Sequence, residues 1–168
     1  MPDTARWLNE NFSDWAILSN QEKKAIRDFP ILWSMFELYA TGQNGTRPNA
    51  DPPAIRRAVE HLVVNFDVDV IRQARDHFSA RYFEDGIETY AFQQLRVHRN
   101  DQQLVRDMLL GENVQGQRIF LGLLLIINRL RNNFLHGEKA RYTFDGQLEN
   151  FRHANRVLMF AIPLWSEP

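Results

Sequence analysis

The sequence RIFLGLLLIINRLRNNFLHGEK, residues 118–139, contains the longest apolar run of the chain and ends in a cluster of polar side chains. Its apolar residues predict a helix from about 117 to 136, with Gly137 as the C-terminal cap. The run Ile119–Ile127 is too short to cross a bilayer, so no membrane span is expected. A helix that is apolar all round needs cover on all sides, which suggests that a second copy of the chain supplies part of that cover.

The segments on either side of this stretch also have helical patterns. Ser19 and Glu22 have the spacing of a capping box at the start of a helix, and Pro30, further along the same helix, is expected to kink or restart it. The other expected helices cover 4–18, 53–66, most of 67–100 with a break near 84–86, 101–110 and 147–164. The sequence therefore predicts an all-α, single-domain helical bundle over 1–168, in which N-terminal helices at 1–40 precede a bundle at 53–168.

Composition excludes several kinds of site. The 168 residues include no cysteine, which excludes disulfides, thiolate zinc sites and a cysteine nucleophile, and suits a cytoplasmic protein. The net charge is −1, but the charge is unevenly distributed: from residue 116 onward the chain has seven basic and four acidic residues. The preceding residues carry thirteen basic and seventeen acidic side chains. Any anion-binding face is therefore expected in the last third of the chain.

The polar residues that end the long helix share one face. Each helical residue turns by roughly 100°, so Asn132 lies about 40° to one side of His136, and Arg129 and Asn133 lie about 20° and 60° to the other. Arg131 lies about 140° from His136, beside the apolar stripe. The polar face is thus predicted to point away from the main core of this helix.

The segment Arg131-Asn132-Asn133-Phe134-Leu135-His136 resembles the RX4–6H signature of the HEPN superfamily (higher eukaryotes and prokaryotes nucleotide-binding domains). In that family a polar residue such as Asn commonly follows the arginine, and the motif ends a helix of an all-α bundle. The flanking pattern is also similar: an apolar helix precedes the motif, and glycine, basic residues and a final amphipathic helix follow it.

The resemblance implies a metal-independent endoribonuclease without a cofactor, in which two protomers line one cleft. His136 would move protons at the ribose 2′-OH and the leaving 5′-oxygen. Arg131 would stabilise the charge that develops on the phosphorus, and Asn132 would orient the phosphate or the histidine. Further RNA-binding residues would be Arg129, Asn133, Lys139 and Arg141. The implied partners are an RNA substrate, a second copy of the chain and, in a toxin or phage-defence system, an antitoxin protein.

Two details of the motif leave alternatives open. Arg129 gives the six-residue spacing and shares the His136 face, so it could replace Arg131 as the motif arginine. One subgroup of these toxins carries a tyrosine two residues after the histidine, which an antitoxin adenylylates. That position is Glu138 here and the next tyrosine is Tyr142, so control by that route is not expected.

A non-catalytic interpretation stands beside the catalytic one. Arg131 and His136 could simply form a basic helix end that contacts the last carbonyl groups. The whole chain could then be a HEPN-like module that binds RNA, a nucleotide or a protein. His61, His77, His98 and His153 lack the spacing of metal ligands, and no metal site is expected. Three arginines among acidic residues predict a solvated helix face: Arg72, Arg75 and Arg81.

Overall fold

Helix starts in the structure follow the capping residues of the sequence. In the computed structural model, which describes residues 3–42, 47–135 and 146–166, the Ser19 hydroxyl accepts from the Glu22 amide and the Glu22 carboxylate accepts from the Ser19 amide. Asp51 caps the next long helix in the same way through the Ala54 amide. Both contacts satisfy backbone donors that the first helical turn leaves unpaired.

The elements are helical except for one short hairpin. In chain order they are α1 (Thr4–Asn11), α2 (Ser13–Ala16), α3 (Asn20–Thr41), α4 (Pro52–Glu60), α5 (Asp69–Tyr82), β1 (Phe83–Glu84), β2 (Ile87–Glu88), α6 (Tyr90–Leu95), α7 (Gln102–Leu110), α8 (Gly116–Leu135), α9 (Leu148–Ala161) and α10 (Pro163–Ser166). The break expected near 84–86 is the antiparallel turn of β1 and β2, where Asp85 and Gly86 have φ values of 50° and 77°. The all-α class predicted from the sequence is confirmed.

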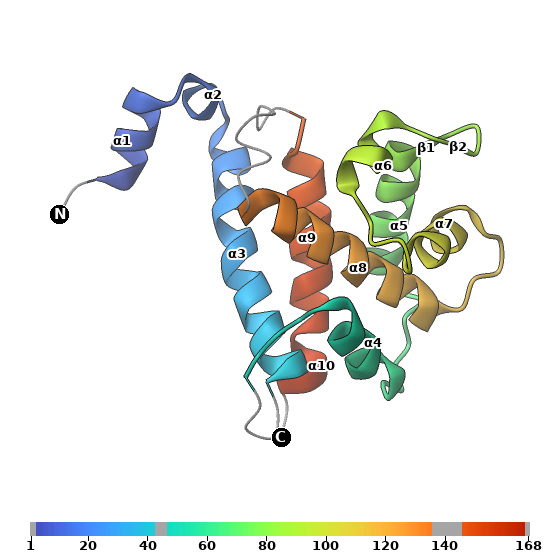
Figure 1. Ribbon diagram of the computed structural model, residues 1–168. Helices are drawn as coiled ribbons and strands as arrows, with labels where there is room; N and C mark the ends of the chain where they lie inside the picture. The colour runs from blue at the N-terminus through green and yellow to red at the C-terminus, as the bar shows by residue number, and fades with distance from the viewer. Residues whose placement is uncertain (1–2, 43–46, 136–145, 167–168) are drawn as a thin grey trace.

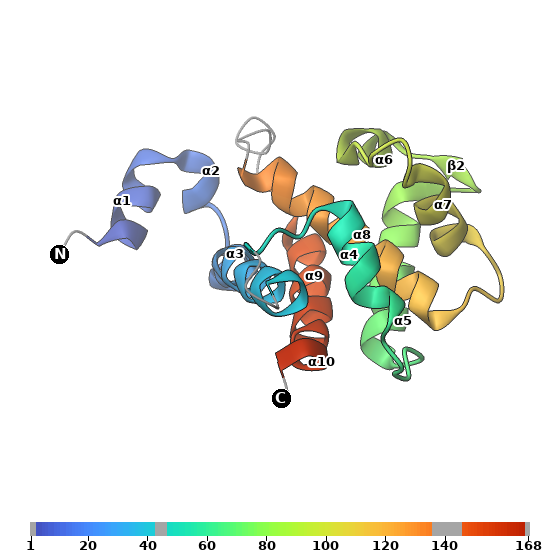
Figure 2. The ribbon, with the colours of Figure 1, turned by 60° about the horizontal axis from the view of Figure 1, so that its bottom comes forward.

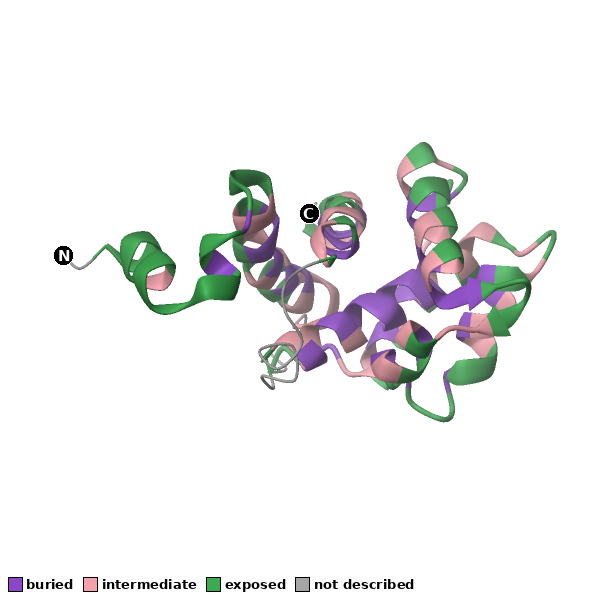
Figure 3. Ribbon diagram, turned by 90° about the horizontal axis from the view of Figure 1, so that it is seen from above, coloured by how far each residue is buried: buried purple, intermediate pink, exposed green. Residues whose placement is uncertain are grey.

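Helix α8 lies at the centre of the arrangement. It runs across α9, from α4 and α7 at one end to α3 at the other, while α5 packs on α9 from the side opposite α3 (Figures 1 and 2). Helix α1, which has no buried residue, projects away from this body, while α2 contributes the buried Trp15. Figure 3 shows the continuous buried surface along α8, in which Phe120, Leu124 and Leu125 are at most 2% exposed. Leu121, on the same helix, is partly buried. Most of the cover that this helix needs is therefore supplied within one chain, and the apolar helix does not by itself require a second copy.

Helix α3 continues past its proline, and helix α4 is shorter than its pattern predicts. Pro30 lies inside α3, which continues from Asn20 to Thr41 without restarting. Helix α4 ends at Glu60 rather than near 66, and a distant side chain caps its last turn. The Gln117 amide donates to the Val59 carbonyl at 2.8 Å, with longer contacts to two neighbouring carbonyls. That cap comes from α8, so no local sequence signal could show it.

Candidate functional site

Arg131 lies where α8 reaches α3. Its guanidinium carbon is 5.8 Å from the centroid of the Trp33 ring, so the cation lies over the aromatic face. Nη1 donates to the side-chain oxygen of Asn132 at 2.9 Å. These two contacts fix both the plane and the direction of the guanidinium.

A series of hydrogen bonds anchors Arg131 to the chain segment before α4. Asn132 donates to the Asn128 side-chain oxygen at 3.3 Å, and Asn128 donates to the Ala50 carbonyl at 2.8 Å. The Ala50 amide in turn donates to Glu37 of α3 at 3.0 Å. Since Asn128 and Asn132 are one helical turn apart, the series runs along one side of α8. It holds Arg131 without neutralising it.

Two donors at this place have no hydrogen-bond partner. They are Nε of Arg131 and Nε1 of Trp33, and Trp33 is only 2% exposed. Among residues 3–42, 47–135 and 146–166, no carboxylate forms an ion pair with Arg131. A buried donor without an acceptor is costly, so these two N–H groups are an energetic cost that the fold accepts at this place.

Arg129 and Asn133 turn to another side of α8, toward α6. The Arg129 Nε donates to the Leu95 carbonyl at 3.3 Å. The Asn133 amide donates to the Gln94 and Leu95 carbonyls at 3.2 and 3.3 Å. Both residues thus cap the end of α6, where Arg96 takes a left-handed conformation with φ of 53°. Arg131 therefore contacts α3, whereas Arg129 contacts α6 on another side of α8.

The expectation that the polar face points away from the core is corrected in part. Asn128 and Asn133 are 5% and 8% exposed and bond to backbone carbonyls of neighbouring segments. The surfaces of α6 and of the segment before α4 cover this face at Asn133 and Asn128. His136, Lys139 and Arg141, which complete the predicted site, lie outside the described residues.

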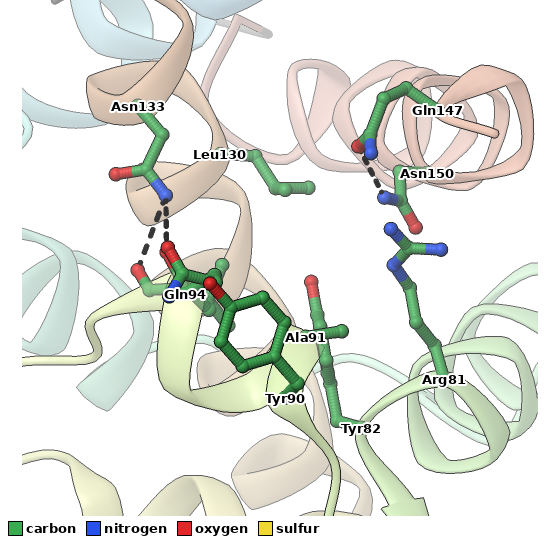
Figure 4. A pocket seen from close by; sticks show the side chains of 10 residues that line it. Arg81, Tyr82, Tyr90, Ala91, Gln94, Leu130, Asn133, Gln147 and Asn150 are labelled. Carbon is green, nitrogen blue, oxygen red and sulfur yellow. Dashed lines mark hydrogen bonds between the residues drawn. The ribbon is translucent and has the colours of Figure 1, made fainter. Parts of the chain in front are cut away.

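A cavity of about 220 Å³ opens on the α6 side of α8 (Figure 4). Its walls come from α5, α6, α8 and the beginning of α9, and Leu130 and Asn133 are the contribution of α8. The sequence analysis did not identify this cavity. Its cation, Arg81, belongs to the group of arginines predicted to lie on a solvated face, and only the packing of α5 against α9 turns it inward.

The other two arginines of that group have structural roles. Arg72 pairs with Asp67 and Asp69 at the exposed start of α5. Arg75 donates to the Met108 carbonyl at 2.7 Å and to the Gly111 carbonyl, which caps the end of α7. The solvated-face prediction thus holds for Arg72 alone.

Metal ligands do not gather in the described part of the chain, where no three His, Cys, Asp or Glu side chains are placed to share an ion. None of the helices in that part is both long enough and apolar enough to cross a membrane. No protein-family model, curated protein or solved structure matches the chain.

Proposed function

We propose that this protein is a metal-independent endoribonuclease of the HEPN type, in which Arg131, Asn132 and His136 form the reacting site. The observation that carries the proposal is the state of Arg131. Its direction is fixed by Asn132, it has no carboxylate partner in the described part of the chain, and its Nε lacks an acceptor. An arginine held in this way is prepared for an incoming phosphate.

The chemistry follows from the residue types. His136 would take the proton of the ribose 2′-OH, whose oxygen then attacks the adjacent phosphorus. Arg131 would stabilise the added negative charge of the phosphorane. The bond to the 5′-oxygen breaks as that oxygen receives a proton, which leaves a 2′,3′-cyclic phosphate and a 5′-hydroxyl. Arg129, Asn133, Lys139 and Arg141 would extend the contact to the RNA.

The same proposal includes a homodimer whose two motifs line one cleft. It also includes a cytoplasmic role as a toxin or phage-defence effector, with an antitoxin protein as a partner.

The dimer can be tested with spin labels. The chain has no cysteine, so a single Leu135→Cys variant can be spin-labelled at the 53%-exposed end of α8. A composite cleft predicts a shorter distance between labels in the dimer at this position than at Glu112→Cys, beyond the other end of α8. A monomer, or the opposite order of distances, would remove the composite site.

Activity is tested by incubating the purified protein with RNA in EDTA. We expect cleavage with a cyclic phosphate end, and a loss of at least about 100-fold in Arg131→Ala and His136→Ala, as typical for removal of an acid–base or charge-stabilising group. Arg57→Ala removes an exposed arginine of α4 and is the matched control. Cleavage that persists in both motif variants, or that needs a metal, would refute the mechanism.

A second candidate function is a non-catalytic module that binds RNA, a nucleotide or a protein. It is favoured by the packing roles of the polar residues, because Arg129 and Asn133 cap α6 and Arg131 packs on Trp33. A folded protein that retards RNA in a gel without cleaving it would support this candidate over the nuclease.

A further inference from the structure

The cavity beside α6 combines one cation, hydroxyl groups and an apolar wall. Figure 4 shows the Arg81 guanidinium directed toward the Tyr82 hydroxyl and Asn150, with Tyr90 and Gln94 on the opposite side. Leu130 of α8 lies between these two sides. The lining residues are Arg81, Tyr82, Tyr90, Ala91, Gln94, Leu95, Leu130, Asn133, Gln147 and Asn150.

Arg81 interacts with the Tyr82 side chain, but no described carboxylate neutralises its charge. In the described ranges no carboxylate lies within ion-pair distance of it, whereas Arg72, on the same helix, has two such partners. Arg81 is half-buried, so water solvates its guanidinium only in part. A partly desolvated cation without a counter-charge attracts an anion more strongly than an exposed surface arginine does.

The neighbouring groups suit the anion that Arg81 would attract. The Tyr82 side chain is fully buried, and burial raises the pKa of its phenol although the Arg81 charge opposes that change. Tyr82 therefore remains protonated at neutral pH and keeps a hydroxyl donor beside the guanidinium. Asn150, by contrast, is already committed, since it donates to Gln147 at 2.8 Å and its oxygen is 2.9 Å from the His77 ring nitrogen.

The rest of the cavity sets the size and character of the ligand. A volume of about 220 Å³ admits an oxyanion with a small organic body. Ala91, Leu95 and Leu130 give that body an apolar wall. Tyr90, which is 66% exposed, lies at the mouth, where its ring can cover a planar or sugar-like group.

We propose that this cavity binds a small organic oxyanion, a phosphate monoester or a carboxylate, through Arg81 and the Tyr82 hydroxyl. The guanidinium offers two parallel donors to two oxygens of the anion, and Tyr82 offers a third. This site faces α6 and is distinct from the Arg131–Trp33 contact, which faces α3. The proposal does not depend on the nuclease proposal, because Arg81 and Tyr82 take no part in the proposed cleavage reaction. Asn133 is the one lining residue that the two proposals share.

The test uses ribose 5-phosphate and benzoate as probes, with ribose and benzamide as their uncharged counterparts. Binding to the full chain is followed by amide NMR shifts. We expect one of the anions to bind, with shifts concentrated at residues 81–82, 90–95, 130, 133 and 147–150. Its uncharged counterpart should bind at least about tenfold more weakly. The preferred anion distinguishes a phosphate site from a carboxylate site.

Two variants separate this site from general anion binding. Arg81→Met keeps the aliphatic stem and removes the charge, while Ala91→Phe fills the cavity and keeps the charge. Each should weaken binding at least about tenfold, and Arg57→Met, at an exposed arginine of α4, should leave it unchanged. Binding that survives in either cavity variant, or no binding of either anion to the unaltered protein, would overturn the proposal. Because Ala91→Phe leaves Arg81 in place, the test does not depend on the folding of one variant.

Discussion

The guanidinium of Arg131 lies over the ring of Trp33, with 5.8 Å between the guanidinium carbon and the ring centroid. This contact joins the end of α8 to the middle of α3, and it leaves the indole nitrogen without a hydrogen-bond partner. The ring, rather than the N–H group, therefore accounts for the contribution of Trp33 to the structure.

Trp33→Phe should accordingly be much milder than Trp33→Ala. Phenylalanine keeps an aromatic face under Arg131 and removes an unsatisfied donor, so we expect a loss of about 1–2 kcal/mol in the free energy of unfolding, from the smaller volume. Alanine removes the face as well and should cost about 3–5 kcal/mol. Urea unfolding measures both values. Equal losses in the two variants would mean that the indole nitrogen makes a stabilising bond.

Asn128 should contribute more to stability than Asn132, although both belong to the same series of hydrogen bonds. Asn128→Ala leaves the Ala50 carbonyl without its donor in a buried place and should cost about 1–3 kcal/mol. Asn132 is only half-buried, so Asn132→Ala should cost about 1 kcal/mol or less. Unfolding curves of the two single variants check this order, which a larger loss in Asn132→Ala would contradict.

If the nuclease proposal is correct, Asn132→Ala should lower the cleavage activity more than Asn128→Ala does, which is the reverse of their order in stability. Asn132→Ala removes the direct contact that orients Arg131 and should lower kcat by at least about tenfold at nearly unchanged stability. Unchanged kcat in Asn132→Ala would remove Asn132 from the proposed site.

The helices could be predicted from sequence because their signals are local. Apolar spacing and the Ser19 capping box predict α3, and the apolar run predicts α8, which starts at Gly116, one residue before the expected start. The burial of Asn128 could not be predicted, since its acceptor is the carbonyl of Ala50, 78 residues away in the chain. A projection of one helix treats each polar residue as facing water, and only tertiary packing supplies such acceptors.

The inward direction of Arg81 was missed for a related reason. Local sequence placed it among acidic residues and so suggested a solvated face. The adjoining Tyr82 is fully buried, however, and α9 packs against α5. The apolar positions of α5 around this arginine indicate a buried face, but an interpretation based on the charge pattern alone does not take them into account.

Gly122 should not tolerate a side chain. A Cβ there would lie 2.6 Å and 2.8 Å from the Met108 Cε and Cγ atoms, and Met108 is fully buried. Overpacking should exceed the gain in helix propensity, so Gly122→Ala should destabilise the protein by about 1–2 kcal/mol. In the Met108→Ala background the two closest contacts are absent, and the same change should be neutral or stabilising. Equal effects in both backgrounds, measured by a double-mutant cycle, would show that this contact does not limit packing.

Stability should fall on acidification because of the stacked pair His77 and His153. The rings are 4.5 Å apart and nearly parallel, and burial, followed by the charge of His77, lowers the pKa of His153 from its ordinary value of 6.5. Glu149 opposes this shift, while Arg156 and Arg152 add to it. The unfolded chain therefore binds the proton more tightly than the folded one.

The stability contributed by neutral His153 is fully present above 6.5, falls as pH drops through 6.5, and stops falling only below the lower folded-state pKa. Between about pH 7.5 and pH 5, His153→Gln should have a flatter stability profile than the unaltered protein. His61→Gln, at an exposed histidine after α4, should keep the original slope. Glu149 does not contribute to the slope in this pH range, because the Arg152 hydrogen bond lowers the pKa of its carboxyl below 4.5. Its effect on stability therefore appears at more acid pH. An unchanged slope in His153→Gln would show that the pair does not sense pH in this range.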